Sequence, residues 1–173
     1  MKDESKGLIQ VYTGNGKGKT TAALGLAMRA AGRGLKVIII QFLKGEECGE
    51  HLFISQNTKI KILQLNTGNC LQQSTAELQQ VVEETWVCSQ EKVASGEYDL
   101  VILDEVFVAI HRELLLATDV LELMGHKPDH VELVLTGRNV PPEIVREADL
   151  VTEMLMIKHP YTEGIGQRMG IEL

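Results

Sequence analysis

The stretch LIQVYTGNGKGKTTAALGLAMRAAGRG, residues 8–34, decides the fold of this 173-residue chain. Its apolar start, residues 8–13, predicts a strand, and a helical pattern follows over residues 19–31. The turn between them is rich in glycine and ends in GKTT. Such a turn curls its backbone amides around an anion, and the N-terminus of the following helix adds positive potential. The stretch therefore predicts a site for phosphate groups.

The spacing of this turn differs from that of the standard phosphate-binding loop. The standard motif has four residues between its first glycine and its Gly-Lys pair, but here Thr13 stands at that first position and the nearest glycine is Gly14. The loop is thus either one residue tighter or begins with a threonine. A merely glycine-rich turn with two chance lysines would not explain GKTT. Lys19 is expected to reach the phosphates, and the hydroxyl of Thr20 to ligate Mg²⁺.

A second motif is DLVILDE, residues 99–105, an apolar run that ends in two carboxylates. If this strand lies beside the first one, Asp104 and Glu105 face the phosphates and their metal ion, as in a Walker B element. The alternative is that one of the two carboxylates caps the following helix. Together with the phosphate loop, the motif predicts Asp104 and Glu105 as further metal ligands.

A third motif is LVLTGRN, residues 133–139. It places Thr136, Gly137 and Arg138 at the carboxyl edge of another strand, where open α/β sheets bind their ligands. Arg138 is expected to touch the triphosphate; the alternative is a solvated surface arginine.

The rest of the chain alternates short apolar runs with longer amphipathic ones, which favours an α/β fold with a mostly parallel sheet covered by helices on both faces. Strands are predicted at 8–13, 36–42, 59–65, 98–104, 131–137 and 150–155, and helices at 19–31, 75–94, 110–124 and 142–148. Ser74 and Glu77 form a capping box before the second helix. Residues 43–57 and 66–74 are expected to be loops, and the tail 158–173 to pack back over the domain.

Composition limits the possible partners. The net charge is −7 and the sequence pI about 5.3, which argues against nucleic acid held by bulk electrostatics. Apolar runs such as residues 37–40 are far too short to span a membrane. The three cysteines match no zinc or disulfide pattern and suggest free thiols, and the five histidines show no metal spacing. We expect one cytoplasmic domain over residues 1–173.

These motifs together resemble the P-loop type of ATP:corrinoid adenosyltransferases. The matching stretches are TGNGKGKTTAALGLAMRA (13–30), VIIIQFLKG (37–45), YDLVILDEV (98–106), LVLTGRN (133–139), ADLVTEM (148–154) and KHPYTEGIGQRMGIEL (158–173). The resemblance implies a P-loop NTPase (RecA-like) three-layer fold. It also implies a reaction in which the cobalt(I) of a reduced corrinoid attacks the ribose C5′ of ATP and triphosphate leaves. Cobalt(I) is itself the nucleophile, so no catalytic base is required.

The resemblance assigns roles residue by residue. The implied nucleotide-binding residues are Gly14, Asn15, Gly16, Lys17, Gly18, Lys19, Thr20, Thr21 and Arg29. Lys19 and Arg138 would stabilise the triphosphate, and Thr20, Glu105 and Asp104 would bind Mg²⁺. Arg29 lies roughly 13 Å along the helix from Thr20, so its alternative role is to stabilise the C-terminal end of the helix dipole. The implied partners are ATP, a corrinoid, an electron-donating reductase, acceptor proteins and a second copy of the chain.

The sequence departs from the family after its third predicted strand. The family usually carries aromatic rings there, whereas this chain has Asn69 and Leu71. Two other functions stay open, the first because P-loop domains host many reactions and the second because the aromatic rings are missing. A P-loop phosphotransferase or NTPase with another acceptor would release ADP rather than triphosphate. A non-catalytic nucleotide- or corrinoid-binding protein would bind ATP tightly without turnover.

Overall fold

The described residues form one six-stranded, all-parallel sheet with the strand order β3-β2-β4-β5-β1-β6. A computed structural model describes residues 6–56, 59–68, 70 and 72–172 of the chain. The strands are β1 (Ile9–Thr13), β2 (Val37–Gln41), β3 (Ile60–Gln64), β4 (Leu100–Asp104), β5 (Glu132–Thr136) and β6 (Leu150–Glu153). All six predicted strands are present, each within or close to its expected range.

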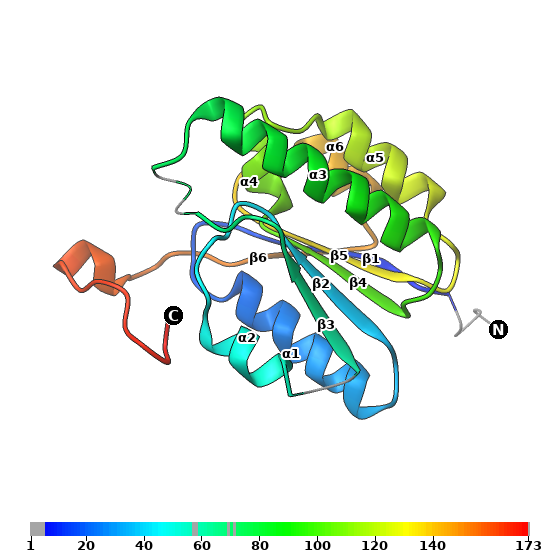
Figure 1. Ribbon diagram of the computed structural model, residues 1–173, viewed down its shortest axis with the longest axis horizontal. Helices are drawn as coiled ribbons and strands as arrows, with labels where there is room; N and C mark the ends of the chain where they lie inside the picture. Colours follow the sequence, from blue (N-terminus) through cyan, green and yellow to red (C-terminus); the bar gives the residue numbers. More distant parts are fainter. Residues whose placement is uncertain (1–5, 57–58, 69, 71, 173) are drawn as a thin grey trace.

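Helices cover both faces of the sheet (Figure 1). The helices are α1 (Lys19–Gly32), α2 (Gly49–Ile54), α3 (Thr75–Ala94), α4 (Val106–His111), α5 (Ala117–His126) and α6 (Pro142–Glu147), and a 3₁₀ turn η1 (Pro160–Glu163) follows. The first two lie below the sheet in this view, and the other four lie above it. This confirms the three-layer α/β fold expected of a P-loop protein.

Each face of the sheet has its own apolar core. On one side Ala23 and Ala27 of α1 pack near Ile102, and these small alanines let the helix approach the strands closely. On the other side Leu103 packs with Phe107 and the buried residues of α3 and α5. Successive residues of β4 therefore point to opposite cores. This explains why its sequence reads as an unbroken apolar run.

Three sequence predictions are corrected by the structure. The single helix expected at 110–124 is two helices, α4 and α5, because the chain turns at Glu113, whose φ is +59°, and then buries Leu114 and Leu115. The loop expected at 43–57 contains the short helix α2. Finally, β4 is not beside β1, because β5 lies between them.

The capping box predicted at the start of α3 is present: Ser74 Oγ accepts from Glu77 N at 3.3 Å, and Ser74 N donates to Glu77 Oε2 at 2.8 Å.

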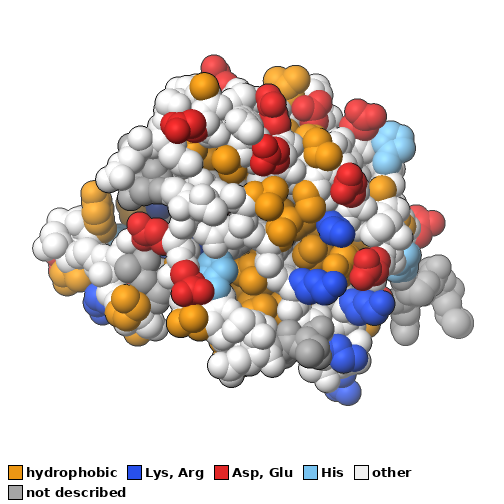
Figure 2. Space-filling view, in the orientation of Figure 1, with side chains coloured by type: hydrophobic (Ala, Val, Ile, Leu, Met, Phe, Trp, Pro, Cys, Tyr) orange, Lys and Arg blue, Asp and Glu red, His pale blue; other side chains and the backbone are white. Residues whose placement is uncertain are grey.

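The α3 side of the molecule is acidic. Figure 2 shows acidic side chains spread over the upper half of the molecule, where Figure 1 places α3 and α5. A polyanion would be repelled from this surface. Across the described part of the chain, no helix combines the length and apolar character needed to cross a bilayer.

Candidate functional site

The predicted phosphate loop connects β1 to α1 at the carboxyl edge of the sheet. Gly14 and Gly18 have φ values of +96° and +119°, which favour glycine. The loop also lies tightly against the end of β6. A Cβ at Gly14 would come within 2.4 Å of the Met154 carbonyl oxygen, and Gly16 N donates to that same oxygen at 2.7 Å. Close backbone packing therefore requires glycine at Gly14 and Gly16.

Lys19 begins α1 and is buried, with 6% of its surface exposed. Its Nζ donates to the carbonyl oxygens of Gly14 (2.9 Å) and Gly16 (3.0 Å), so the ammonium lies across the loop. Burial lowers the pKa of Lys19, while the nearby Glu105 and Asp104 carboxylates oppose that shift. A cation held in this position would face an anion bound by the loop amides.

The side chains of Thr20 and Asp104 are in contact next to the phosphate loop. The hydroxyl of Thr20 donates to Asp104 Oδ1 at 2.9 Å, and the hydroxyl of Thr136 donates to the same oxygen at 2.7 Å. Asp104 is only 1% exposed. The carboxylate reaches the loop although β5 separates its strand from β1. Because the proton of Thr20 points to Asp104, the lone pairs of its hydroxyl remain available for a cation.

Glu105 occupies a strained position beside this contact. It has left-handed backbone angles (φ +62°, ψ +20°), and its amide donates to Thr136 Oγ1 at 2.9 Å. It stands at the N-cap position of α4 but makes no side-chain capping bond there, so the capping alternative does not describe Glu105. Burial first, and the neighbouring Asp104 second, raise the pKa of this carboxyl above its usual value. A nearby cation would stabilise the ionised form of such a carboxyl.

The other predicted site residues are less closely assembled. Arg138 follows β5, is exposed, and lies near enough to affect the pKa values of both Lys19 and Glu105. Thr21 is exposed in the first turn of α1. Arg29 is exposed in the last turn of that helix, where it acts on the pKa of Tyr12. This position suits the helix-dipole alternative, since Arg29 is far from the loop.

A cavity of about 250 Å³ opens beside the two carboxylates. Its walls are partly apolar and partly charged, with carboxylates as well as cations, and are formed by Thr20, Phe42, Leu43, Lys44, Cys70, Asp104, Glu105, Val108 and Arg112. Asn69 and Leu71, the positions of the expected aromatic rings, lie outside the described residues. Cys70, between them in sequence, lines this cavity. The cavity could therefore hold a second, largely apolar molecule next to the metal-ligand candidates.

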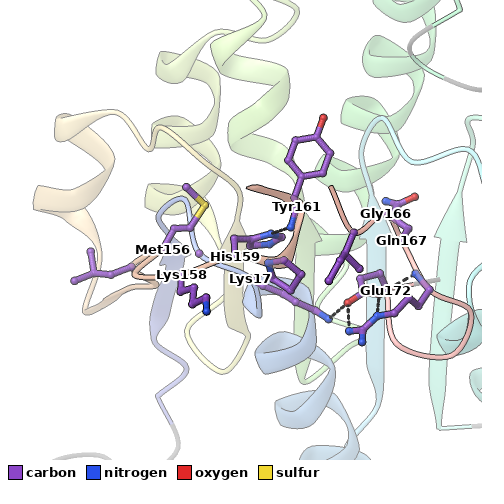
Figure 3. A pocket seen from close by; sticks show the side chains of 13 residues that line it. Lys17, Met156, Lys158, His159, Tyr161, Gly166, Gln167 and Glu172 are labelled. Atoms are coloured by element: carbon purple, nitrogen blue, oxygen red, sulfur yellow. Dashed lines mark hydrogen bonds and ion pairs between the residues drawn. The ribbon is translucent and has the colours of Figure 1, made fainter. Parts of the chain in front are cut away.

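The C-terminal tail leaves the sheet at its carboxyl edge and lies over the phosphate loop only in part. Lys17 donates to Glu172 Oε1 at 2.7 Å, and Glu172 also pairs with Arg168 at 2.9 Å (Figure 3). Between the tail and the loop lies a cavity of about 330 Å³. Most tail residues are nevertheless exposed, so the expected packing over the domain is limited to the loop. The Lys17 side chain points to the tail.

Sequence reasoning missed two residues next to this site, Gln41 and His51. Gln41 ends β2 and is 1% exposed, and its Nε2 donates to Asp104 Oδ2 at 3.1 Å. His51 in α2 contacts Gln41 at 2.8 Å. One sequence signal existed: Gln41 is a polar residue that directly follows the apolar run VIII of β2.

Comparisons with known proteins identify the family of the chain. The family model described as ATP:corrinoid adenosyltransferase BtuR/CobO/CobP matches residues 5–173. A corrinoid adenosyltransferase from Sinorhizobium sp. is similar, with 35% identity over 99% of this chain and 82% of its own length. So are the corrinoid adenosyltransferase of Escherichia coli K12 (31%) and the corrinoid adenosyltransferase CobA of Salmonella typhimurium LT2 (32%), each over 98% of this chain and 87% of the relative. The chain therefore belongs to the BtuR/CobO/CobP family of ATP:corrinoid adenosyltransferases, enzymes that attach an adenosyl group from ATP to a corrinoid.

Proposed function

We propose that residues 14–20 hold the triphosphate of ATP as the leaving group of this reaction. The observation that carries the proposal is the position of Lys19, whose buried ammonium lies across the loop carbonyls. The electron pair of cobalt(I) forms the bond to C5′, and the C5′–oxygen bond breaks with its electrons passing to triphosphate. Lys19, the loop amides and Arg138 oppose the growing negative charge. The chain then contributes positioning and charge stabilisation.

We further propose that Mg²⁺ is held at Thr20, Asp104 and Glu105. Their donor set fits, since Mg²⁺ prefers hard oxygen ligands and is commonly bound by one or two carboxylates together with substrate phosphates. When bound, Mg²⁺ would neutralise part of the triphosphate charge. Thr20 is oriented by Asp104, and the raised pKa of Glu105 marks a carboxyl that lacks a full countercharge. These two features support the assignment.

The corrinoid is larger than this cavity, so we propose that it lies over the opening of the cavity beside Asp104 and Glu105. Phe42, Leu43 and Val108 offer apolar contacts there, and Lys44 and Arg112 offer cationic ones. Reduction of cobalt requires an electron-donating protein, and delivery of the product requires an acceptor protein. Both contacts would be transient.

We also propose a homodimer, because several large apolar side chains of the tail are exposed, including Leu155 (68%), Ile157 (91%) and Met169 (85%). The three free cysteines are compatible with the cytoplasm, where we place the protein as one catalytic domain of residues 1–173.

A product assay tests the proposed reaction. Purified protein is incubated with ATP, Mg²⁺ and chemically reduced cobalamin or cobinamide, and the visible spectrum and the phosphate products are followed. We expect the light-sensitive adenosylated corrinoid and triphosphate in equal amounts. Release of ADP without a cobalt–carbon bond would favour a phosphotransferase or NTPase. Tight ATP binding without either product from both corrinoids would favour a binding protein.

A smaller prediction concerns the ion pair between the tail and the loop. Replacing Glu172 with glutamine should free Lys17 and tighten ATP binding about two- to fivefold at low salt, the range of an exposed ion pair. Glu163→Gln is the matched control, because Glu163 pairs with Lys158 (3.3 Å) in the same tail. Calorimetric titration with ATP measures both variants. Weaker binding by Glu172→Gln would mean that the pair holds the loop in its binding shape.

A further inference from the structure

The two oxygens of the Asp104 carboxylate accept three side-chain hydrogen bonds, and two of the three donors, Thr136 and Gln41, lie outside the phosphate-loop motif. Oδ1 accepts the two threonine hydroxyls, and Oδ2 accepts the amide of Gln41. Gln41 and Asp104 are paired in register at the ends of β2 and β4. Both side chains are 1% exposed, so this amide has no access to water as an alternative partner.

His51 fixes which way the Gln41 amide points. Gln41 Oε1 lies 2.8 Å from His51 Nε2, and an amide oxygen can only accept, so His51 donates from Nε2. The other ring nitrogen, Nδ1, accepts from the Cys48 amide at 2.9 Å. One neutral tautomer satisfies both contacts. The amide nitrogen of Gln41 is thereby directed to Asp104.

We propose that Gln41 and His51 are positioning residues that orient the Asp104 carboxylate, and through it the Thr20 hydroxyl, for binding of the metal–nucleotide complex. The inference rests on the proposed function of Thr20 and Asp104. If the Gln41 amide turned, its oxygen would face Oδ2 and repel it. The carboxylate would then rotate, and Thr20 would lose the acceptor that keeps its lone pairs free for the cation.

A metal site at α2 is the competing interpretation, because ligand atoms of Cys48, Glu50 and His51 lie within 4.8 Å of one another. Each of these groups is already engaged. Both nitrogens of His51 have partners, and Glu50 pairs with Lys44 at 2.6 Å. Burial raises the pKa of the Cys48 thiol, which disfavours the thiolate form that a metal ion binds. The hydrogen-bonded chain through Gln41 accounts for His51 better than a second metal ion does.

The test compares two replacements of His51. His51→Leu keeps the bulk but removes the donor, while His51→Gln retains an N–H for Gln41 Oε1. Binding of Mn²⁺ to the protein–ATP complex is measured by electron paramagnetic resonance, which needs no turnover. We expect His51→Leu to weaken Mn²⁺ binding about 10- to 100-fold, the range for partners that orient metal ligands. His51→Gln should stay within about threefold of the unmodified protein on the same basis.

Ser55→Ala is the matched structural control, since Ser55 donates to the Leu52 carbonyl at the end of α2 and has no part in the chain to Asp104. It should leave Mn²⁺ binding unchanged. Unaltered Mn²⁺ binding by His51→Leu would overturn the inference, and so would an equal loss in all three variants. The inference would also be overturned if His51→Leu weakened metal-free ATP binding as much as it weakens Mn²⁺ binding. The replacement would then act on the phosphate loop rather than on the metal ligands. Failure of the unmodified protein to bind Mn²⁺ with ATP would instead reject the proposed metal site itself.

Discussion

Replacing Lys19 with alanine is expected to lower kcat/KM for adenosyl transfer about 10²- to 10³-fold, the usual cost of removing one group that stabilises developing charge. The reason is the location of the ammonium. It is buried, it lies across the loop, and burial already lowers its pKa, so its charge is poorly screened by water. In such surroundings the interaction with a leaving triphosphate is stronger than it would be at the surface.

The comparison variant is Lys17→Ala, in the same loop. Lys17 is exposed and pairs with Glu172, so its removal should cost less than about tenfold, as expected for a screened charge. Initial rates are measured with saturating reduced corrinoid over a range of ATP concentrations. A fall of less than tenfold for Lys19→Ala, or equal effects of the two variants, would show that the loop does not use Lys19 as proposed.

Replacing Glu105 with glutamine should have opposite effects on activity and on stability. Adenosyl transfer should fall about 100-fold, because a carboxylate that helps hold the metal ion is lost. The unliganded protein should become more stable at pH 7. The folded state raises the pKa of Glu105 above its ordinary value of 4.5, through burial and the adjacent Asp104. Folding therefore becomes less favourable as the pH rises from 4.5 through the folded pKa, and glutamine avoids that penalty.

The stability effect is checked by urea unfolding without ATP or metal at two pH values. At pH 7 the free energy of unfolding of Glu105→Gln should exceed that of the unmodified protein. At pH 4, below the unfolded pKa, most of this difference should disappear, because Glu105 is then mostly protonated in both states. A variant that is less stable at pH 7 would mean that the carboxylate already has a compensating partner in the unliganded protein.

Local patterns predicted most of the fold. The apolar runs of β2 and β4 and the glycines before α1 determine their elements through short-range physics, and the structure confirms them. The split between α4 and α5 was not predicted, because no glycine or proline marks it. The chain turns there so that Leu114 and Leu115 can reach the core, which is a tertiary effect. Helix α2 is only six residues long and has too few turns to show a period.

The candidate site was predicted only in its local parts. The loop and the Asp104–Glu105 pair are recognisable because each follows a strand directly. The Gln41–His51 contact depends on the register between β2 and β4 and on where α2 lies. Neither is encoded in a local pattern. For the same reason the sequence did not reveal that β5 separates β1 from β4, or that the end of β6 supports the loop.

The close contact of the phosphate loop with β6 limits how this enzyme can change. At Gly14 and Gly16 an added methyl group would meet backbone atoms of Met154 and Leu155, which cannot move aside as a side chain can. Selection therefore has little freedom in the loop that we propose to hold the nucleotide. Under the same proposal, new substrate preferences would arise at the replaceable side chains around the neighbouring cavity, such as Leu43 and Val108.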